Sequence, residues 1–246
     1  MSTRAPKYFF VHIQKAAGTS LIFRLRRHFG RAAIYPPESD RGDVASVISV
    51  DHLLERWRAQ HDTTRVVTGH FPLCTADLLG ESFTTLTLLR DPVERTLSYL
   101  RHHRQMTPDD AELSLEAIYG DPLRFQGLIH NHMVKMFSLT PSEMTDGLLT
   151  SVEFTSSRLE RAKERLAHVD VVGVQANFEG FCDTLTQRFG WNLGGLTHVN
   201  RSEPVDVSET FRARISEDNA MDVELYEFAL QLIREKNGRK DDRTTA

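Results

Sequence analysis

Short apolar runs alternate with amphipathic stretches over the first 90 positions of the chain. The run "KYFFVHI" at residues 7–13 is almost uninterrupted and is rich in β-branched and aromatic residues, a pattern typical of a strand covered on both faces. Leu21, Leu25 and Phe29 then recur on one helical face. Gly30 is placed to end that helix. The chain is therefore predicted to begin with a strand that leads into a helix.

Further strands are predicted from similar runs at residues 65–68, 82–89 and 169–174. A helical pattern occupies residues 51–61, between the apolar runs at residues 7–13 and 65–68. Because helical patterns separate successive strands, the sheet should be mainly parallel. We predict an α/β fold, with a mainly parallel central sheet flanked by helices.

The C-terminal half of the chain is predicted to be rich in helices. Apolar residues follow the helical period at residues 156–169, 177–190 and 220–236. In the first of these segments, Ser157 and Glu160 have the spacing of a capping box. The pattern therefore predicts that this helix begins next to Ser157.

No internal repeat and no linker rich in Pro, Gly or Ser divides the chain, so we expect a single domain spanning residues 1–246. Residues 237–246, "NGRKDDRTTA", are too polar to pack and are expected to form a disordered tail. A chain of 246 residues with 40% hydrophobic residues can bury a sizeable core.

The formal net charge of −4 argues against a protein that coats nucleic acid. The two cysteines, Cys74 and Cys182, are far apart and form no CxxC pattern, which favours buried thiols in a reducing compartment. No signal peptide and no apolar run long enough to span a bilayer is apparent. We therefore expect a cytoplasmic location.

The turn after the first strand has the features of an anion site. Ala17 and Gly18 are small enough for a phosphate to approach the backbone, and the following helix exposes unpaired N–H groups at its positive end. Thr19 and Ser20 add hydroxyl donors, and Lys15 adds a full charge. The Walker A pattern does not fit, because the lysine precedes the glycine. An ordinary strand–helix turn remains an alternative for this stretch.

A second candidate anion site lies at the next informative strand–helix junction, "LLRDPVERTLSYL". Asp91 is suited to cap the helix, Pro92 to its first turn, and Glu94 to completing a capping box. Arg90 stands at the carboxyl end of a strand, where α/β sheets bind ligands. Together with Ser98 on the following helix, Arg90 can hold a phosphate.

These two motifs resemble those of the sulfotransferases that use 3′-phosphoadenosine 5′-phosphosulfate (PAPS). "VHIQKAAGTSL" resembles the 5′-phosphosulfate loop of the family, commonly written HIPKTGGTS, and "LLRDPVERTLSYL" resembles its 3′-phosphate motif. "TGHFP", "VVGVQANFEGFCDTL" and "HVNRS" are weaker echoes that extend the resemblance over most of the chain. The branch it resembles most contains the glycan sulfotransferases, such as the heparan and chondroitin enzymes.

The resemblance implies a P-loop-NTPase-like sulfotransferase fold, PAPS as the sulfuryl donor and no metal. Its 5′ side would be held by Lys15, Gly18, Thr19 and Ser20, and its 3′-phosphate by Arg90 and Ser98. A loop residue, Arg201, would cover it. The residues implied to contact PAPS are Lys15, Ala17, Gly18, Thr19, Ser20, Arg90, Ser98 and Arg201. Lys15 would also neutralise charge on the departing phosphate. Gln14, Ala16 and Ala17 depart from the family's proline, threonine and glycine.

An acceptor hydroxyl must lose a proton when it is sulfated, and His70, directly after a predicted strand, is the candidate base. The alternative for His70 is a histidine that caps the strand or is satisfied in the core. His102 or His103 could line the acceptor cleft. His130 and His132 have no third residue at a convincing metal-ligand spacing.

The predicted function is transfer of a sulfuryl group from PAPS to a hydroxyl acceptor, with a carbohydrate or glycoconjugate favoured by the branch. A small-molecule acceptor stays open, as do an ATP-dependent phosphotransferase and an inert nucleotide-binding protein. Residues 35–58 and 107–138 match no assignable pattern and are expected to shape the acceptor pocket. The oligomeric state cannot be inferred from the sequence.

Overall fold

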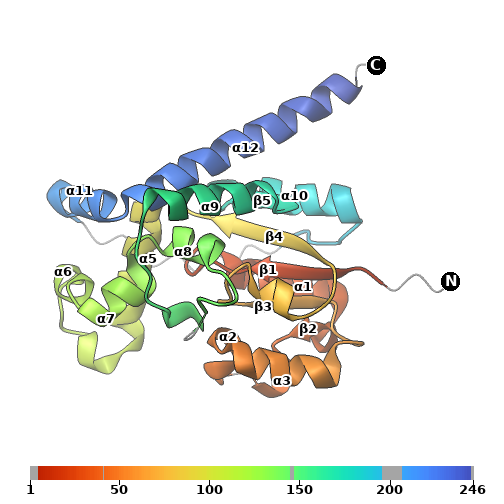
Figure 1. The fold of residues 1–246 in the computed structure, drawn as a ribbon, viewed down its shortest axis with the longest axis horizontal. Helices are drawn as coiled ribbons and strands as arrows, with labels where there is room; N and C mark the ends of the chain where they lie inside the picture. The colour runs from red at the N-terminus through yellow and green to blue at the C-terminus, as the bar shows by residue number, and fades with distance from the viewer. Residues whose placement is uncertain (1–4, 41, 145–146, 196–206, 245–246) are drawn as a thin grey trace.

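The computed structural model describes residues 5–40, 42–144, 147–195 and 207–244 (Figure 1). The strands are β1 (Lys7–Val11), β2 (Ile34–Tyr35), β3 (Val66–Gly69), β4 (Phe83–Leu89) and β5 (Val171–Val174). The helices are α1 (Gly18–Phe29), α2 (Ala45–Ile48), α3 (Val50–Gln60), α4 (Thr75–Leu78), α5 (Pro92–Met106), α6 (Leu115–Tyr119), α7 (Pro122–Arg124), α8 (His132–Ser138), α9 (Ser156–Ala167), α10 (Phe178–Phe189), α11 (Glu209–Asp218) and α12 (Ala220–Thr244). Short 3-10 or π-helical turns lie at Arg31–Ala33, Glu38–Asp40, Pro108–Asp110, Phe125–Ile129, Gly147–Leu149 and Gln175–Asn177.

The strands form a five-stranded sheet in the order β2-β3-β1-β4-β5, and every neighbouring pair is parallel. This confirms the predicted α/β fold with a parallel central sheet. The edge strand β2 was not predicted, because it contains only Ile34 and Tyr35 and two residues show no periodicity.

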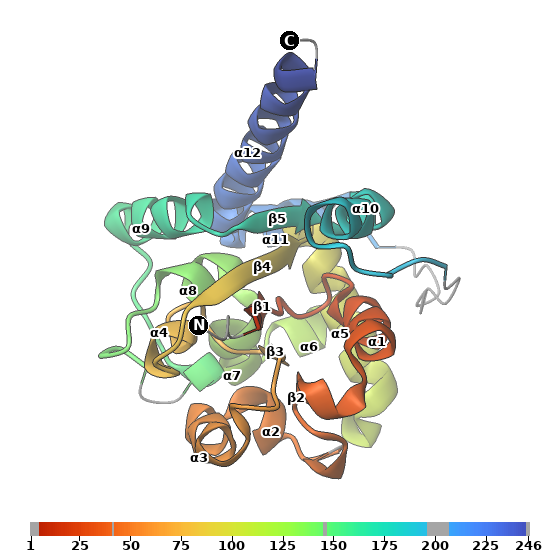
Figure 2. The ribbon, with the colours of Figure 1, turned by 90° about the vertical axis from the view of Figure 1, so that its right-hand side faces the viewer.

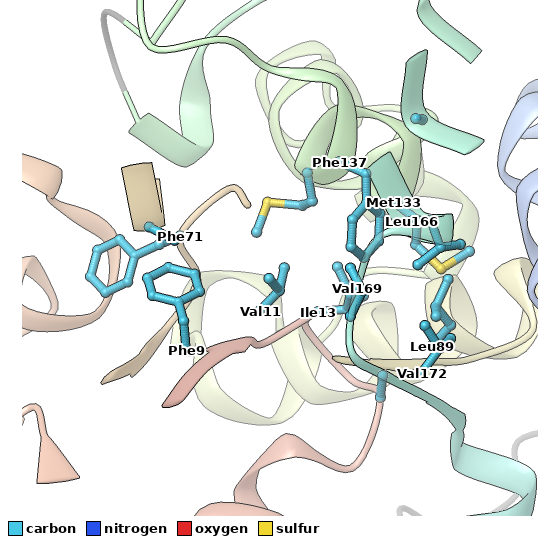
Figure 3. Close-up of a cluster of buried hydrophobic side chains, with 14 of the residues drawn as sticks. Phe9, Val11, Ile13, Phe71, Leu89, Met133, Phe137, Leu166, Val169 and Val172 are labelled. Atoms are coloured by element: carbon cyan, nitrogen blue, oxygen red, sulfur yellow. The ribbon is translucent and has the colours of Figure 1, made fainter. Parts of the chain in front are cut away.

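Helices cover both faces of the sheet, and the side chains of β1 alternate between two cores. Phe9 and Val11 pack with α3, α8, α9 and α12, whereas Tyr8 and Phe10 pack with α1 and α10. In Figure 2 the strands are stacked from β5 to β2, with α8 and α9 on one side and α1 and α10 on the other. Figure 3 shows the first core, where Phe9 and Val11 lie in one layer with Phe137 of α8. Burial on both faces explains why β1 reads as an uninterrupted apolar run.

The ends of two predicted helices test the capping assignments. Asp91 caps α5 as predicted, because its Oδ1 accepts a hydrogen bond from the backbone N–H of Glu94 at 2.9 Å. The capping box at Ser157 is wrong. Thr155 caps α9 instead and accepts from the N–H of Arg158 at 3.3 Å.

Buried polar groups fasten the start of α12 to the start of α8. The Asp222 carboxylate accepts hydrogen bonds from the backbone N–H groups of Met133 (3.0 Å) and Val134 (2.8 Å). Burial raises the pKa of Asp222 to about 6, while Arg95 and these N–H donors favour its charged form. Burial also lowers the pKa of the neighbouring Lys135 to about 8. Near pH 7 the charged Asp222 carboxylate therefore stabilises two buried cations, Arg95 and Lys135.

The last helix, α12, leaves the body of the molecule and runs outward to its C-terminal end (Figures 1 and 2). The helix continues to Thr244, past the end at Lys236 that the sequence predicts. In the described part of the chain, no helix combines the length and the apolar character needed to cross a bilayer.

Asp222→Ala is expected to destabilise the protein by about 3–5 kcal/mol, because it leaves two buried cations without their carboxylate and two backbone N–H groups without an acceptor. Urea denaturation at pH 7 measures this change. Glu224→Ala is the matched control on the same helix, since the Glu224 side chain is 55% exposed in its ion pair with Lys163. The control should cost at most about 1 kcal/mol. Equal effects of the two substitutions would contradict the assigned role of Asp222.

Candidate functional site

Three candidate regions come together because the strands before them are neighbours in the sheet. They are the turn after β1, His70 after β3 and Arg90 after β4. Val11, the last residue of β1, lies opposite Gly69 of β3 on one side and Thr87 of β4 on the other. The chain leaves β1 toward the β2–β3 side of the sheet and leaves β4 toward β5. The carboxyl ends of β1 and β4 therefore flank a topological switch point, the place where open α/β sheets bind ligands.

The turn between β1 and α1 has an unusual backbone that suits an anion. Lys15 and Ala17 both adopt left-handed conformations, with φ of 66° and 64°. Ala17 is the N-cap of α1 and makes no side-chain capping hydrogen bond, whereas Asp91 caps α5. The first N–H groups of α1 therefore lack a side-chain acceptor, and alternating backbone conformations of this kind form anion-binding concavities.

Two cationic side chains meet at this turn. Arg90 Nη1 donates a hydrogen bond to the backbone carbonyl of Lys15 at 3.1 Å. Burial lowers the pKa of Lys15, and the charge of Arg90 lowers it further. Among the described residues Lys15 has no carboxylate partner, and the buried Nε of Arg90 has no hydrogen-bond acceptor. This unused donor and the uncompensated charge of Lys15 make the turn favourable for an anionic ligand.

Gly18 is required by the histidine behind the turn. A Cβ atom on Gly18 would lie 2.0 Å from both Cδ2 and Nε2 of His12. The His12 ring stacks on Phe10, with ring centroids 5.5 Å apart, and lies 4.4 Å from the His70 ring. His12, predicted as a buried strand residue, is buried just beyond β1 and supports both the turn and His70.

His70 is held in one orientation by its contact with the His12 backbone. Its Nδ1 lies 2.9 Å from the His12 carbonyl oxygen, which can only accept a hydrogen bond. The neutral ring therefore carries its proton on Nδ1, and Nε2 is left unprotonated. Burial lowers the pKa of His70, the hydrogen bond to His12 opposes this shift, and the charge of Lys15 adds to it. At neutral pH His70 is thus a neutral imidazole that can accept a proton.

One face of α5 lies near the turn. Ser98 and His102 lie one helical turn apart on the same face of α5. Burial lowers the pKa of His102, and the charge of Lys15 lowers it further, so this face lies within electrostatic range of the turn. Ser98 is buried, while Thr19 is exposed and Ser20 is half-buried. Contact of these three hydroxyls with a phosphate remains a prediction.

The structure corrects one expectation about the charged residues near the site. Glu94 does not close a capping box; its carboxylate binds Arg212 of α11. A second long-range pair joins the buried Arg24 of α1 to Glu179 of α10 by two hydrogen bonds, at 2.8 and 2.6 Å. Neither partner could be found from the sequence, since both lie more than one hundred positions away. Arg201, the remaining predicted contact, lies outside the described residues.

Three other residues singled out from the sequence are buried. His132 is fully buried, and burial lowers its pKa well below the usual range. Cys74 and Cys182 are free and buried, as predicted. No cluster of three or more His, Cys, Asp or Glu side chains suited to a metal ion occurs among the described residues. A cavity of about 750 Å³ runs along β5, α10 and α12 and includes none of the candidate residues.

The fold has a counterpart among solved structures. The chain is similar to a structure described as a sulfotransferase from Alicyclobacillus acidocaldarius, with a TM-score of 0.51 over 92% of this chain and 95% of that one. The two sequences are 16% identical, so the likeness shows the fold. No family model matches the chain. No curated protein matches it either. The predicted sulfotransferase fold is confirmed, whereas the resemblance to the glycan branch stays a prediction.

Substitutions at adjacent positions of the turn should have opposite effects on stability. Gly18→Ala is expected to cost about 1–3 kcal/mol, because the added methyl group displaces the His12 ring. Ala17→Gly is expected to stabilise the protein by up to about 1 kcal/mol. Glycine removes the strain of the left-handed conformation, but it also makes the unfolded chain more flexible, which cancels part of the gain. Urea denaturation compares both with the wild type. A neutral Gly18→Ala would show that His12 does not pack on this glycine.

Proposed function

We propose that the protein transfers a sulfuryl group from PAPS to a hydroxyl acceptor. The observation that carries the proposal is the meeting of Lys15 and Arg90, which come from adjacent strand ends and are joined by a hydrogen bond of 3.1 Å. PAPS carries anionic groups at both its 5′ and its 3′ positions, and two linked cationic positions match that arrangement. The sulfotransferase fold supports this choice of donor.

The chemistry of the residues fits the donor. The uncapped start of α1 and the small residues Ala17 and Gly18 would receive the 5′-phosphosulfate, with Thr19 and Ser20 as hydroxyl donors. The Arg90 guanidinium, together with Ser98, would receive the 3′-phosphate. Arg201 would add a contact from its loop. Lys15 would lie between the two ends of the anionic ligand.

In the transfer step, His70 Nε2 accepts the proton of the acceptor hydroxyl while the new O–S bond forms. The bond between sulfur and the bridging phosphate oxygen breaks, and its electron pair stays on that oxygen. Lys15 stabilises the negative charge that develops there, which is where electrostatic stabilisation is most effective. The hydrogen bond from Nδ1 to the His12 carbonyl keeps the His70 ring in the tautomer that this step requires.

The acceptor is a sugar hydroxyl of a carbohydrate or glycoconjugate in this proposal. The motif resemblance to the glycan sulfotransferases supports that class, and a neutral histidine suits the deprotonation of an alcohol. The buried free thiols Cys74 and Cys182 are consistent with the expected cytoplasmic location.

Binding of adenosine 3′,5′-bisphosphate is the first test. It should raise the melting temperature, with about 2.7 kcal/mol of stabilisation at one hundred times its dissociation constant. ATP with Mg²⁺ should produce a smaller effect. Lys15→Ala and Arg90→Ala should each weaken binding, whereas Arg31→Ala, which removes an exposed arginine paired with Glu38, should not. Stabilisation by ATP and Mg²⁺ alone would refute the proposal in favour of a phosphotransferase.

His70→Ala should lower kcat by about two to four orders of magnitude and retain bisphosphate binding. Because burial lowers the pKa of His70, its basic form persists below pH 6.5, and kcat/KM of the wild type should fall only at lower pH. Turnover of labelled PAPS with a panel of sugar acceptors measures both effects. His168→Gln removes an exposed histidine that contacts the Glu164 carbonyl, and it should keep the wild-type pH profile. Near-normal turnover by His70→Ala would exclude it as the base.

A further inference from the structure

Glu94 lies between two arginines, Arg212 of α11 and Arg90, which stands in the junction between β4 and α5. Its Oε1 binds Nη2 of Arg212, from α11, and its Oε2 lies 4.0 Å from Nη2 of Arg90. The hydrogen bond to Glu94 is the first cause of the raised pKa of Arg212. The Arg212 contact is therefore a hydrogen-bonded ion pair, whereas the Arg90 contact is at the limit of an ion pair.

The unequal contacts matter because Arg90 is at the candidate anion site. Arg90 is fixed by its bond to the Lys15 carbonyl, and its buried Nε has no acceptor among the described residues. A carboxylate that closed on Arg90 would occupy the guanidinium donors that a phosphate would use, and its charge would repel a phosphate directly. Glu94 is placed to do this, since it lies in the first turn of α5 and its Oε2 is already 4.0 Å from Nη2 of Arg90, one residue before the N-cap.

The position of Arg212 is set by packing. Phe211 and Ile215, on the same helix, are buried in a core with Leu97 and Leu100 of α5. Ser208 caps α11 by accepting a hydrogen bond from the N–H of Phe211. Helix α11, which carries Arg212, is therefore packed firmly against α5, which carries Glu94 in its first turn.

We infer that Arg212 is a positioning residue for the anion site, which holds the Glu94 carboxylate away from Arg90 and thereby keeps Arg90 available to the 3′-phosphate of the donor. This inference rests on the proposed function. Arg212 acts through Glu94 and need not touch the ligand. Without Arg212, the Glu94 carboxylate turns to Arg90, and a 3′-phosphate has to displace it.

The test compares two ligands that differ only in the 3′-phosphate, adenosine 3′,5′-bisphosphate and adenosine 5′-phosphate, by calorimetry at low salt. Arg212→Ala should weaken the bisphosphate by about two- to fivefold, as expected for one partly exposed charge pair, and leave the monophosphate unchanged. Arg212→Ala/Glu94→Gln should restore wild-type affinity for the bisphosphate. In turnover assays, Arg212→Ala should raise KM for PAPS with kcat unchanged.

Arg214→Ala is the matched control, because it removes an arginine from the same helix that faces Asp218 at 3.6 Å. It should leave the ratio of the two affinities at its wild-type value. If the double variant binds the bisphosphate as weakly as Arg212→Ala, or if Arg212→Ala leaves the ratio unchanged, the inference is wrong. If the wild type does not bind the bisphosphate, the proposed function itself fails.

Discussion

The hydrogen bond from Arg90 to the Lys15 carbonyl joins the two strand ends on which the candidate site depends. It can form because β1 and β4 are adjacent and in register, so that residues 75 positions apart leave the sheet side by side. It also brings two cations together, one of them in a strained turn and both partly buried. Like charges and burial both oppose ionisation, and the lowered pKa of Lys15 reflects both effects. The fold tolerates this cost at the switch point, where a bound anion would remove it.

The same turn shows how the sheet and the chemistry are connected. Gly18 leaves room for the His12 ring, the His12 ring packs on Phe10, and the His12 carbonyl fixes the ring of His70. His12 just after β1, the glycine of the turn and the end of the neighbouring strand β3 therefore act together to set one imidazole tautomer. Strain at Lys15 and Ala17 is confined to the turn, while the strands beneath it are regular and buried on both faces. Strain of this kind is typical of functional sites.

Local patterns were sufficient for most of the fold but for little of the polar chemistry. The strands β1, β3 and β4 and the Asp91 cap follow from runs of a few neighbouring residues, and each was predicted. The contact between Glu94 and Arg212 spans 118 positions, and that between His70 and His12 spans 58. Such pairs depend on how helices dock, which a single sequence does not encode in any short pattern. The Thr155 cap was missed for another reason, because Ser157 offered an equally good signal nearby.

The two segments that match no sequence pattern both contact the turn that carries His70. The N–H of His70 donates to the carbonyl of Val47, at 2.7 Å, and the N–H of Leu73 donates to the carbonyl of Met136, at 2.9 Å. Val47 lies within residues 35–58 and Met136 within residues 107–138. Under the proposed function, an acceptor that presents its hydroxyl to His70 would therefore approach beside these segments. Both contacts use backbone groups, which leave no signature in the pattern of side chains, and this explains why the sequence alone does not assign a role to these segments.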